Sequence, residues 1–254
     1  MISRFKFLCV FACVGLLFAC ATEKPVGTGS NANNPVVARA RAHTDLGAAY
    51  LQQNKLEIAL DEFNQAIAID PSYALAYNGL GLVQSALGQD AEAEASFKKS
   101  IELQPNSSES HNNFGGFLCT RKRYDESIVE FLAAVKNPLY ATPNLAYANA
   151  GICADRKGDT KRAEVYLNKA LELEPLTHSA AYQLADIQFR RGDVKTAKMT
   201  LQNALVASPT AEMLWLGVRI ERILGDKDNE ASYALQLRRQ YPNSEQTRLL
   251  LRGK

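Results

Sequence analysis

Large apolar residues recur at a nearly constant interval through most of this chain. They are separated by 34, 34, 36, 34 and 34 positions, and they are Phe63, Phe97, Phe131, Leu167, Leu201 and Leu235. A small residue lies four positions before each of them, namely Ala59, Ala93, Ser127, Ala163, Ala197 and Ala231. A chain that repeats one pattern at such an interval folds as a series of similar units, each of which buries its apolar face against the next.

A period of 34 residues is that of the tetratricopeptide repeat, in which each unit is a pair of helices joined by a turn. We therefore predict an all-α fold, a right-handed tetratricopeptide-repeat superhelix of six helix-turn-helix units, followed by a C-terminal capping helix over 244–251. The predicted units are 40–73, 74–107, 108–143, 144–177, 178–211 and 212–245. The sixth departs most from the pattern, because Arg219 stands where a glycine is expected.

Two features mark the connections between the predicted helices. Four glycines fall at the turn within a unit, where a left-handed residue ends a helix, and they are Gly88, Gly158, Gly192 and Gly225. The third unit is longer than the others, and its segment 136–143 carries two prolines. We consider two explanations for the extra length, a loop that contacts a partner and a surface insertion that the fold tolerates.

The first residues have the pattern of an export signal. Residues 1–19 contain two basic residues followed by an apolar run, as in a secretory signal peptide. Leu17 and Ala19 precede Cys20 as in a bacterial lipobox, which implies cleavage before Cys20 and attachment of a diacylglycerol and an N-acyl chain to it. The alternative is an ordinary signal cleaved after Ala21. We expect 20–38 to be the lipidated cysteine with a flexible tether, and 39–254 to be the repeat domain.

The residue after the predicted acylation site bears on location. Residue 21 is Ala rather than Asp, which in lipoproteins of this kind implies export to the outer membrane. We therefore expect the chain to be lipid-anchored at the periplasmic face of the bacterial outer membrane, in contact with its inner leaflet.

Composition and side-chain patterns argue against several classes of function. The chain has 29 basic and 27 acidic residues, and this balance gives no electrostatic footprint for nucleic acid. No histidine has His, Cys or acidic neighbours at metal-ligand spacing, and His43 and His111 occupy a packing position of the repeat. We expect a monomer that is not an enzyme and that takes no metal, no small-molecule substrate and no cofactor besides the covalent lipid.

Two cysteines remain in the predicted repeat domain. Cys119 and Cys153 fall on the first helices of consecutive units, which are neighbours in a superhelix of repeats. Because the periplasm is oxidising, we favour a disulfide between them. The alternative is a pair of buried free thiols that pack as small apolar groups.

The concave surface of the first helices is the predicted protein-binding groove. Repeat positions that face this surface carry apolar residues and asparagines, and the predicted groove residues are Thr44, Ala48, Leu51, Leu75, Asn78, Leu82, Asn112, Asn113, Leu145, Asn149 and Ile152. Grooves that clamp a peptide carboxylate have Lys or Arg at position 5 and Asn at position 9, and this chain has neither. An apolar groove with asparagines suits a short apolar or strand-like segment whose backbone the amides can bond. The alternative is that some of these side chains only pack between units.

These features together resemble one known family. A lipobox, a short tether and six repeats are similar to the type IV pilus biogenesis/stability lipoproteins, the pilotins of the pilus secretin. Two stretches, 111–119 (HNNFGGFLC) and 149–153 (NAGIC), make the resemblance closer.

The resemblance has specific implications for function. It implies an outer-membrane lipoprotein scaffold that binds subunits of the type IV pilus secretin, promotes their localisation and multimerisation, and is needed for pilus biogenesis and twitching motility. It also implies a bridge between Cys119 and Cys153. The alternative function is a repeat lipoprotein adaptor for peptidoglycan hydrolases or outer-membrane assembly factors.

Overall fold

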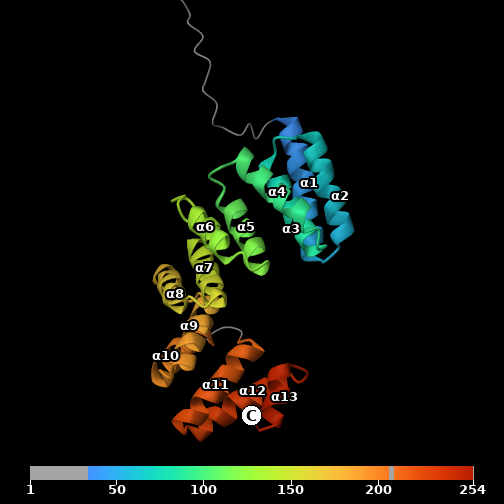
Figure 1. The fold of residues 1–254 in the computed structure, drawn as a ribbon. Coiled ribbons are helices and arrows are strands. Elements are labelled where there is room, and N and C mark those ends of the chain that lie inside the picture. The colour runs from blue at the N-terminus through green and yellow to red at the C-terminus, as the bar shows by residue number, and fades with distance from the viewer. Residues whose placement is uncertain (1–33, 206–208, 254) are drawn as a thin grey trace, which may run out of the picture. The chain divides into compact units, whose positions relative to one another are not determined.

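The structure, a computed structural model, describes residues 34–205 and 209–253. The predicted signal peptide, the acylation site Cys20 and the tether up to residue 33 lie outside the described residues. Within the described ranges every regular element is a helix. The helices form six consecutive pairs and a final single helix (Figure 1). They are α1 (Pro35–Gln52), α2 (Leu56–Ile69), α3 (Ala74–Ala86), α4 (Asp90–Leu103), α5 (Ser108–Thr120), α6 (Tyr124–Ala134), α7 (Pro143–Lys157), α8 (Thr160–Leu173), α9 (His178–Arg191), α10 (Val194–Ala204), α11 (Ala211–Leu224), α12 (Lys227–Gln240) and α13 (Glu245–Leu251).

The helix pairs stack through their first helices. Each first helix contacts its own second helix and the first helix of the next pair, as α3 contacts α4 and α5. Each second helix also contacts the first helix of the following pair, whereas second helices of adjacent described pairs do not contact one another. The first helices therefore form an inner layer and the second helices an outer layer, and the predicted all-α superhelix of helix-turn-helix units is confirmed.

The packing of Phe63 explains why small residues recur on the first helices. Its ring lies between α1 and α3, and a Cβ added to Gly47 or Gly79 would lie 3.0 Å or 2.1 Å from Phe63 Cε1. The second unit repeats the arrangement, since a Cβ on Gly81 would lie 2.9 Å from the Phe97 ring. Both rings are almost completely buried. The two helices of a unit can approach this closely only because one of them presents bare backbone to the ring.

In the sixth unit the observed register of the repeat differs from the predicted one. Ala231 and Leu235, the predicted packing residues, are exposed. Tyr233 takes the place of Leu235, and Gly217 takes the glycine position that was assigned to Arg219; a Cβ on Gly217 would lie 2.9 Å from the Tyr233 ring. These two residues have the same separation as Gly81 and Phe97, so the unit that was predicted to begin at residue 212 begins two residues earlier. The constant interval between large residues concealed the shift, because Leu235 lies on the recurring spacing but not on the buried face.

The start of the repeat domain also differs from the prediction. The tether was predicted to extend to residue 38, but α1 already begins at Pro35. The side chain of Asn34 accepts a hydrogen bond from Val36 N, and proline at the first helical position suits the fixed backbone angle of its ring. The cap and the proline together therefore begin the helix about one turn ahead of the first repeat.

The turns within units have the predicted backbone conformation. Gly88, Gly158, Gly192 and Gly225 all have positive φ, between 76° and 94°. In the first and third units the equivalent residues are Asn54 and Lys122, with φ of 57° and 61°. The turn thus requires a left-handed conformation whether or not the residue is glycine. Lys122 adopts this conformation at a cost in conformational energy.

We predict that Gly79→Ala destabilises the protein by about 1–3 kcal/mol, because the new methyl group would overlap the buried Phe63 ring. Gly116→Ala is the matched control. Gly116 lies inside α5, where an added Cβ would meet no atom within 4 Å, so helix propensity should leave stability unchanged or raise it by up to about 1 kcal/mol. Urea unfolding followed by circular dichroism tests both variants, and equal midpoints for the two would contradict the packing argument.

Candidate functional site

Two pockets lie along the inner layer, between the first helices of the second, third and fourth units. The first, here called the loop pocket, has a volume of about 540 Å³ and lies between the N-terminal ends of α3 and α5 and the connection from α6 to α7. The second, here called the central pocket, has a volume of about 360 Å³ and is lined by residues of α3, α5 and α7 with Phe97 and Arg121. Asn112 and Asn113 line both pockets, which therefore adjoin each other on α5.

The structure brings together about half of the predicted groove residues. Leu75 lines the loop pocket with Asn112 and Asn113, and the central pocket adds Leu82 and Asn149. The remaining predicted groove residues line neither pocket, and they are Thr44, Ala48, Leu51, Asn78, Leu145 and Ile152.

The predicted residues outside the pockets have other roles in the described chain. Thr44 is buried and donates a hydrogen bond to Ala40 O at 2.9 Å. Ala48 and Leu51 pack against the cluster that contains Phe63. In the fourth unit, Ile152 packs against the cluster around the Cys119–Cys153 pair, and Leu145 is exposed. The two pockets thus involve a smaller part of the inner layer than the predicted groove.

The asparagines of the inner layer bond one another between units. Asn113 Nδ2 donates to Asn78 Oδ1 at 3.2 Å, and Asn149 Nδ2 donates to Asn112 Oδ1 at 3.1 Å. Each bond uses the NH₂ group of one amide and the carbonyl group of the other. The amides thus contribute to packing between units, and those of Asn112, Asn113 and Asn149 also line the pockets.

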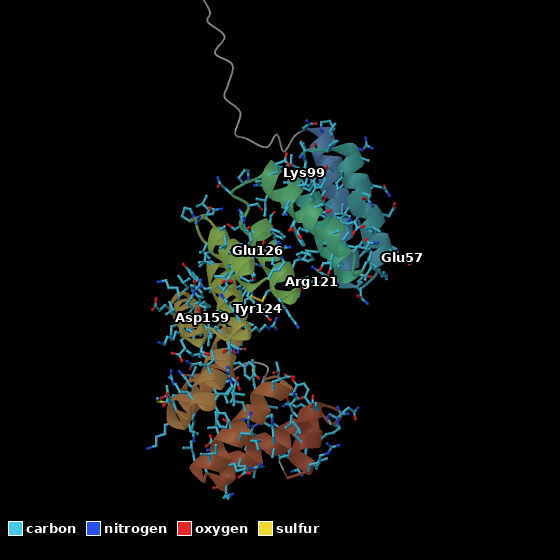
Figure 2. All side chains as sticks on the ribbon, viewed as in Figure 1. Glu57, Lys99, Arg121, Tyr124, Glu126 and Asp159 are labelled. Carbon is cyan, nitrogen blue, oxygen red and sulfur yellow. A yellow bond between two sulfur atoms is a disulfide. The ribbon has the colours of Figure 1, made fainter. Side chains whose placement is uncertain are left out.

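Arg121, which is labelled in Figure 2, lines the central pocket, and its side chain is held by several bonds. Its Nε donates to Asp90 Oδ2 at 3.0 Å, one terminal nitrogen donates to Ser85 O at 3.3 Å, and the guanidinium lies 4.9 Å from the centre of the Phe117 ring. The hydrogen bond from Arg121 lowers the pKa of the Asp90 carboxyl. Because the guanidinium is already paired, it ties α3, α4 and α5 together and does not serve as a free clamp for a peptide carboxylate.

The connection between α6 and α7 supplies one side of the loop pocket, which the predicted groove did not include. Leu139, Tyr140, Ala141 and Thr142 all line the pocket, and Leu139 is 88% exposed. The signal in the sequence was the longer third unit with its two prolines, for which a partner contact was one of two explanations. In the structure these residues line a pocket.

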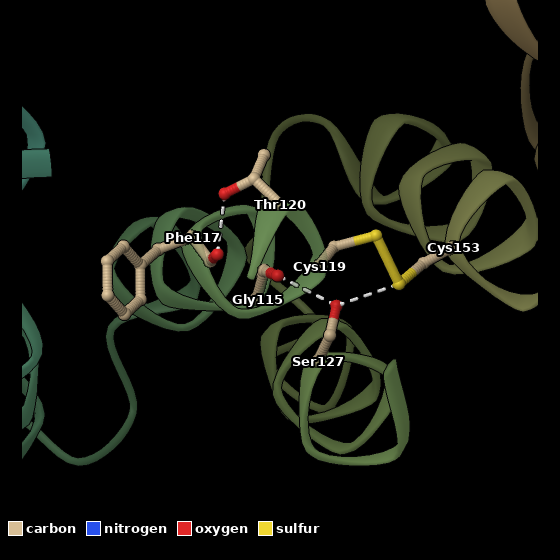
Figure 3. Close-up of a disulfide and its surroundings, with 6 residues drawn as sticks. All are labelled: Gly115, Phe117, Cys119, Thr120, Ser127 and Cys153. Atoms are coloured by element: carbon tan, nitrogen blue, oxygen red, sulfur yellow. Dashed lines mark hydrogen bonds between the residues drawn. A yellow bond between two sulfur atoms is a disulfide. The ribbon is translucent and has the colours of Figure 1, made fainter. Parts of the chain in front are cut away.

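Cys119 and Cys153 form a disulfide that links α5 to α7 (Figure 3). Their Cα atoms are 5.9 Å apart, and both side chains are buried in one apolar cluster. Ser127 on α6 lies beneath the bridge, with its Oγ 3.2 Å from Cys153 Sγ and donating to Gly115 O at 2.7 Å. The third and fourth units, which carry Asn112 and Asn149 of the central pocket, are therefore held together covalently.

His111 anchors the other side of α5. Its Nδ1 lies 2.6 Å from Glu130 Oε2 and its Nε2 lies 3.0 Å from Pro105 O. Because both partners are acceptors, the imidazole satisfies both only when each nitrogen carries a proton. The hydrogen bond to Glu130 raises the pKa of His111 above its usual value of 6.5, with desolvation acting in the opposite direction.

The described chain contains no cluster of three or more His, Cys, Asp or Glu side chains arranged to hold a metal ion. Among the described helices, none combines the length and the apolar character that crossing a membrane requires.

Comparison with known proteins agrees with the repeat architecture. Family models described as TPR repeat or tetratricopeptide repeat match residues 47–88, 74–107 and 149–211, and no catalytic family is indicated. The type IV pilus assembly protein PilF of Pseudomonas aeruginosa is 31% identical over 204 residues, covering 80% of this chain and 81% of that protein. The chain belongs to the PilF family of type IV pilus proteins.

Two solved structures of type IV pilus proteins have the same fold. The structure of Pseudomonas aeruginosa PilF matches with a TM-score of 0.76 and 29% identity, covering 86% of this chain and 99% of that one. The structure of PilW, described as a widely conserved type IV pilus biogenesis factor, matches with a TM-score of 0.73 and 30% identity, covering 84% and 98%. The predicted resemblance to pilus biogenesis proteins built of tetratricopeptide repeats is confirmed.

We predict that replacing both bridged cysteines with serine lowers the stability of this PilF-family protein by about 3–4 kcal/mol, because the closed loop of 34 residues restricts the unfolded chain. Thermal unfolding with and without reductant measures the effect. The wild type should lose stability on reduction, and the double variant should be insensitive to reductant. The prediction would be contradicted if reductant reduced the disulfide of the wild type, as shown by thiol reactivity, but left its thermal stability unchanged.

We predict that NMR titration of His111 gives a pKa above 6.5, and that Glu130→Gln brings it down, because the variant removes the carboxylate that favours the cation. Since the folded-state pKa is the higher one, the stabilising contribution is complete below about pH 6 and is lost as pH rises through the folded-state value. Unfolding curves across pH should therefore converge for wild type and Glu130→Gln at high pH. A wild-type pKa at or below 6.5 would refute the assignment.

Proposed function

We propose that this PilF-family protein is a lipid-anchored scaffold of the outer membrane that binds subunits of the type IV pilus secretin and promotes their localisation and multimerisation. The observation that carries the proposal is the similarity to PilF over four fifths of both chains. PilF is a protein of type IV pilus assembly, and PilW is a factor of type IV pilus biogenesis. The secretin as partner is our extension of these roles to the present chain.

The geometry is consistent with a scaffold that holds a segment of another protein. The loop and central pockets adjoin each other along α5, and both combine apolar side chains with amides that can bond a peptide backbone. The bridge between α5 and α7 and the bonds of Arg121 fix the walls of the surface. A surface organised before binding loses less conformational entropy when a segment docks.

The anchor is the second half of the proposed mechanism. Acylation of Cys20 would hold the repeats at the periplasmic face of the outer membrane, since more than one acyl chain gives stable anchoring. The anchored repeats would then carry an unassembled secretin subunit to that membrane. Residue 20 lies outside the described residues, and this step is supported by the lipobox pattern of the sequence.

Deletion of the gene followed by blotting of membrane fractions for detergent-resistant secretin multimers tests the proposal. We expect multimers to be lost or mislocalised, and to be restored by the wild-type gene but not by Cys20→Ala. Leu75→Glu should also fail to restore them, because it places a charge in the loop pocket. Leu173→Glu is the matched control, since Leu173 is exposed on α8 and lines neither pocket.

The outcomes separate the proposal from its competitor. Normal multimers in the outer membrane of the deletion strain would rule out the secretin scaffold. Recovery of peptidoglycan hydrolases or outer-membrane assembly factors with the protein, in the absence of secretin, would instead favour an adaptor of that kind. Restoration of the multimers by Leu75→Glu as well as by Leu173→Glu would remove the role of the loop pocket while leaving the scaffold in place.

A further inference from the structure

We infer that the loop pocket binds an extended peptide segment that places a large apolar residue next to a basic one. The inference rests on the proposed scaffold function and specifies the chemistry of what the scaffold holds. It is carried by three features of the pocket: a buried hydroxyl group without a partner, a single ionised side chain, and apolar side chains from two separate parts of the chain.

The first feature is Ser108 at the beginning of α5. The residue is only 5% exposed and lines the loop pocket, and its Oγ has no hydrogen-bond partner among the described residues. By contrast, the neighbouring Ser107 and Ser110 bond each other at 2.8 Å. A buried hydroxyl without a partner costs free energy, which a ligand that bonds it would recover.

The end of α5 adds further donors beside that hydroxyl. The backbone N–H groups of Ser108 and Glu109 have no acceptor within the described chain, as is usual at the first turn of a helix. Within the same part of the chain, Asn112 also keeps its NH₂ group free, because only its Oδ1 is bonded, to Asn149. These donors suit the carbonyl groups of a peptide backbone, which is the acceptor that every extended segment presents.

The second feature decides the charge of the occupant. Among the residues that line the loop pocket, Glu109 alone carries an ionised side chain, and no ion pair holds it within the described chain. An anionic ligand at the start of α5 would meet this carboxylate, which opposes the attraction of the helix dipole. A lysine or arginine of the partner would instead form a pair with it.

The third feature sets the apolar part of the occupant. Leu75 comes from α3, whereas Leu139 and Tyr140 come from the connection between α6 and α7, and all three line the pocket. With 88% of its surface exposed, Leu139 is the most exposed of the large apolar residues in the described chain. An apolar side chain between these surfaces would remove Leu139 from water, which is the main gain that an otherwise polar pocket offers.

The volume of the pocket is consistent with this occupant. At about 540 Å³ it lies within the range of sites that hold a ligand of a few residues. The adjoining central pocket would let the segment continue along α5 past Asn113 and Gly116. One extended segment could therefore place its own basic residue beside Glu109 and continue along α5 as far as Phe117.

Photo-crosslinking in host cells tests where the partner lies. A benzoylphenylalanine placed at Leu139 is the probe, and one placed at Val165, which is 64% exposed on α8 and absent from the pocket lining, is the control. We expect Leu139 but not Val165 to form a cross-link, and mass spectrometry should place it on a secretin segment that contains adjacent apolar and basic residues. Cross-linking from Val165 alone, or to a segment without a basic residue, would overturn the inference.

The recovered segment, made as a synthetic peptide, then serves as the probe for affinity to the purified full chain. We expect Glu109→Gln to raise its Kd about three- to fivefold and to weaken its dependence on salt, as for a partly exposed ion pair. Ser108→Ala should weaken binding without lowering the unfolding midpoint, because the hydroxyl has no partner in the free protein. Glu57→Gln is the matched control, because Glu57 lies exposed in the first turn of α2 (Figure 2). Equal Kd values for the two glutamine variants would overturn the inference.

The outcomes distinguish this inference from the proposed function. If secretin is purified together with the protein but Leu139 forms no cross-link to it, the pocket assignment fails and the scaffold stands. If Leu139 forms a cross-link to an apolar and basic segment of a different protein, the pocket assignment stands and the secretin proposal fails. If neither secretin nor any cross-link from Leu139 is found, both fail.

Discussion

The contact between a large side chain of one helix and the bare backbone of another is the interaction on which the repeats depend. In the first unit Phe63 occupies the space between Gly47 and Gly79, and Gly217 with Tyr233 repeats the arrangement at the far end of the described chain. Dense interiors leave no room for an extra methyl group at such points. The distance between first and second helices, and hence the spacing of units, follows from this contact.

That spacing also creates the candidate binding surface. First helices that stack closely bring asparagines of neighbouring units within hydrogen-bond distance, as in the pair Asn112 and Asn149. The disulfide between Cys119 and Cys153 joins the same two helices. The part of the inner layer that forms pockets is thus also braced by bonds between units, which gives a bound segment a firm surface.

The longer third unit changes one end of this surface. Four-residue connections follow α2, α4, α8 and α12, whereas residues 135–142 after α6 reach the N-terminal end of α5. A two-residue extension is enough to place Leu139 and Tyr140 beside Leu75, which lies more than sixty positions earlier in the sequence. Loops that vary among similar units are where repeat proteins usually acquire specificity.

The sequence by itself determined the helices, their pairing and the left-handed turns, because each depends on residues within one unit and is repeated at a regular interval. It also pointed to Leu75, Leu82, Asn112, Asn113 and Asn149, which do line the pockets. Only the tertiary structure decided the register of the sixth unit, since either Leu235 or Tyr233 could have filled its core and the choice depends on where Gly217 lies. It alone showed the partners of Arg121 and the reach of residues 135–142, because these residues are not part of the pattern that recurs from unit to unit.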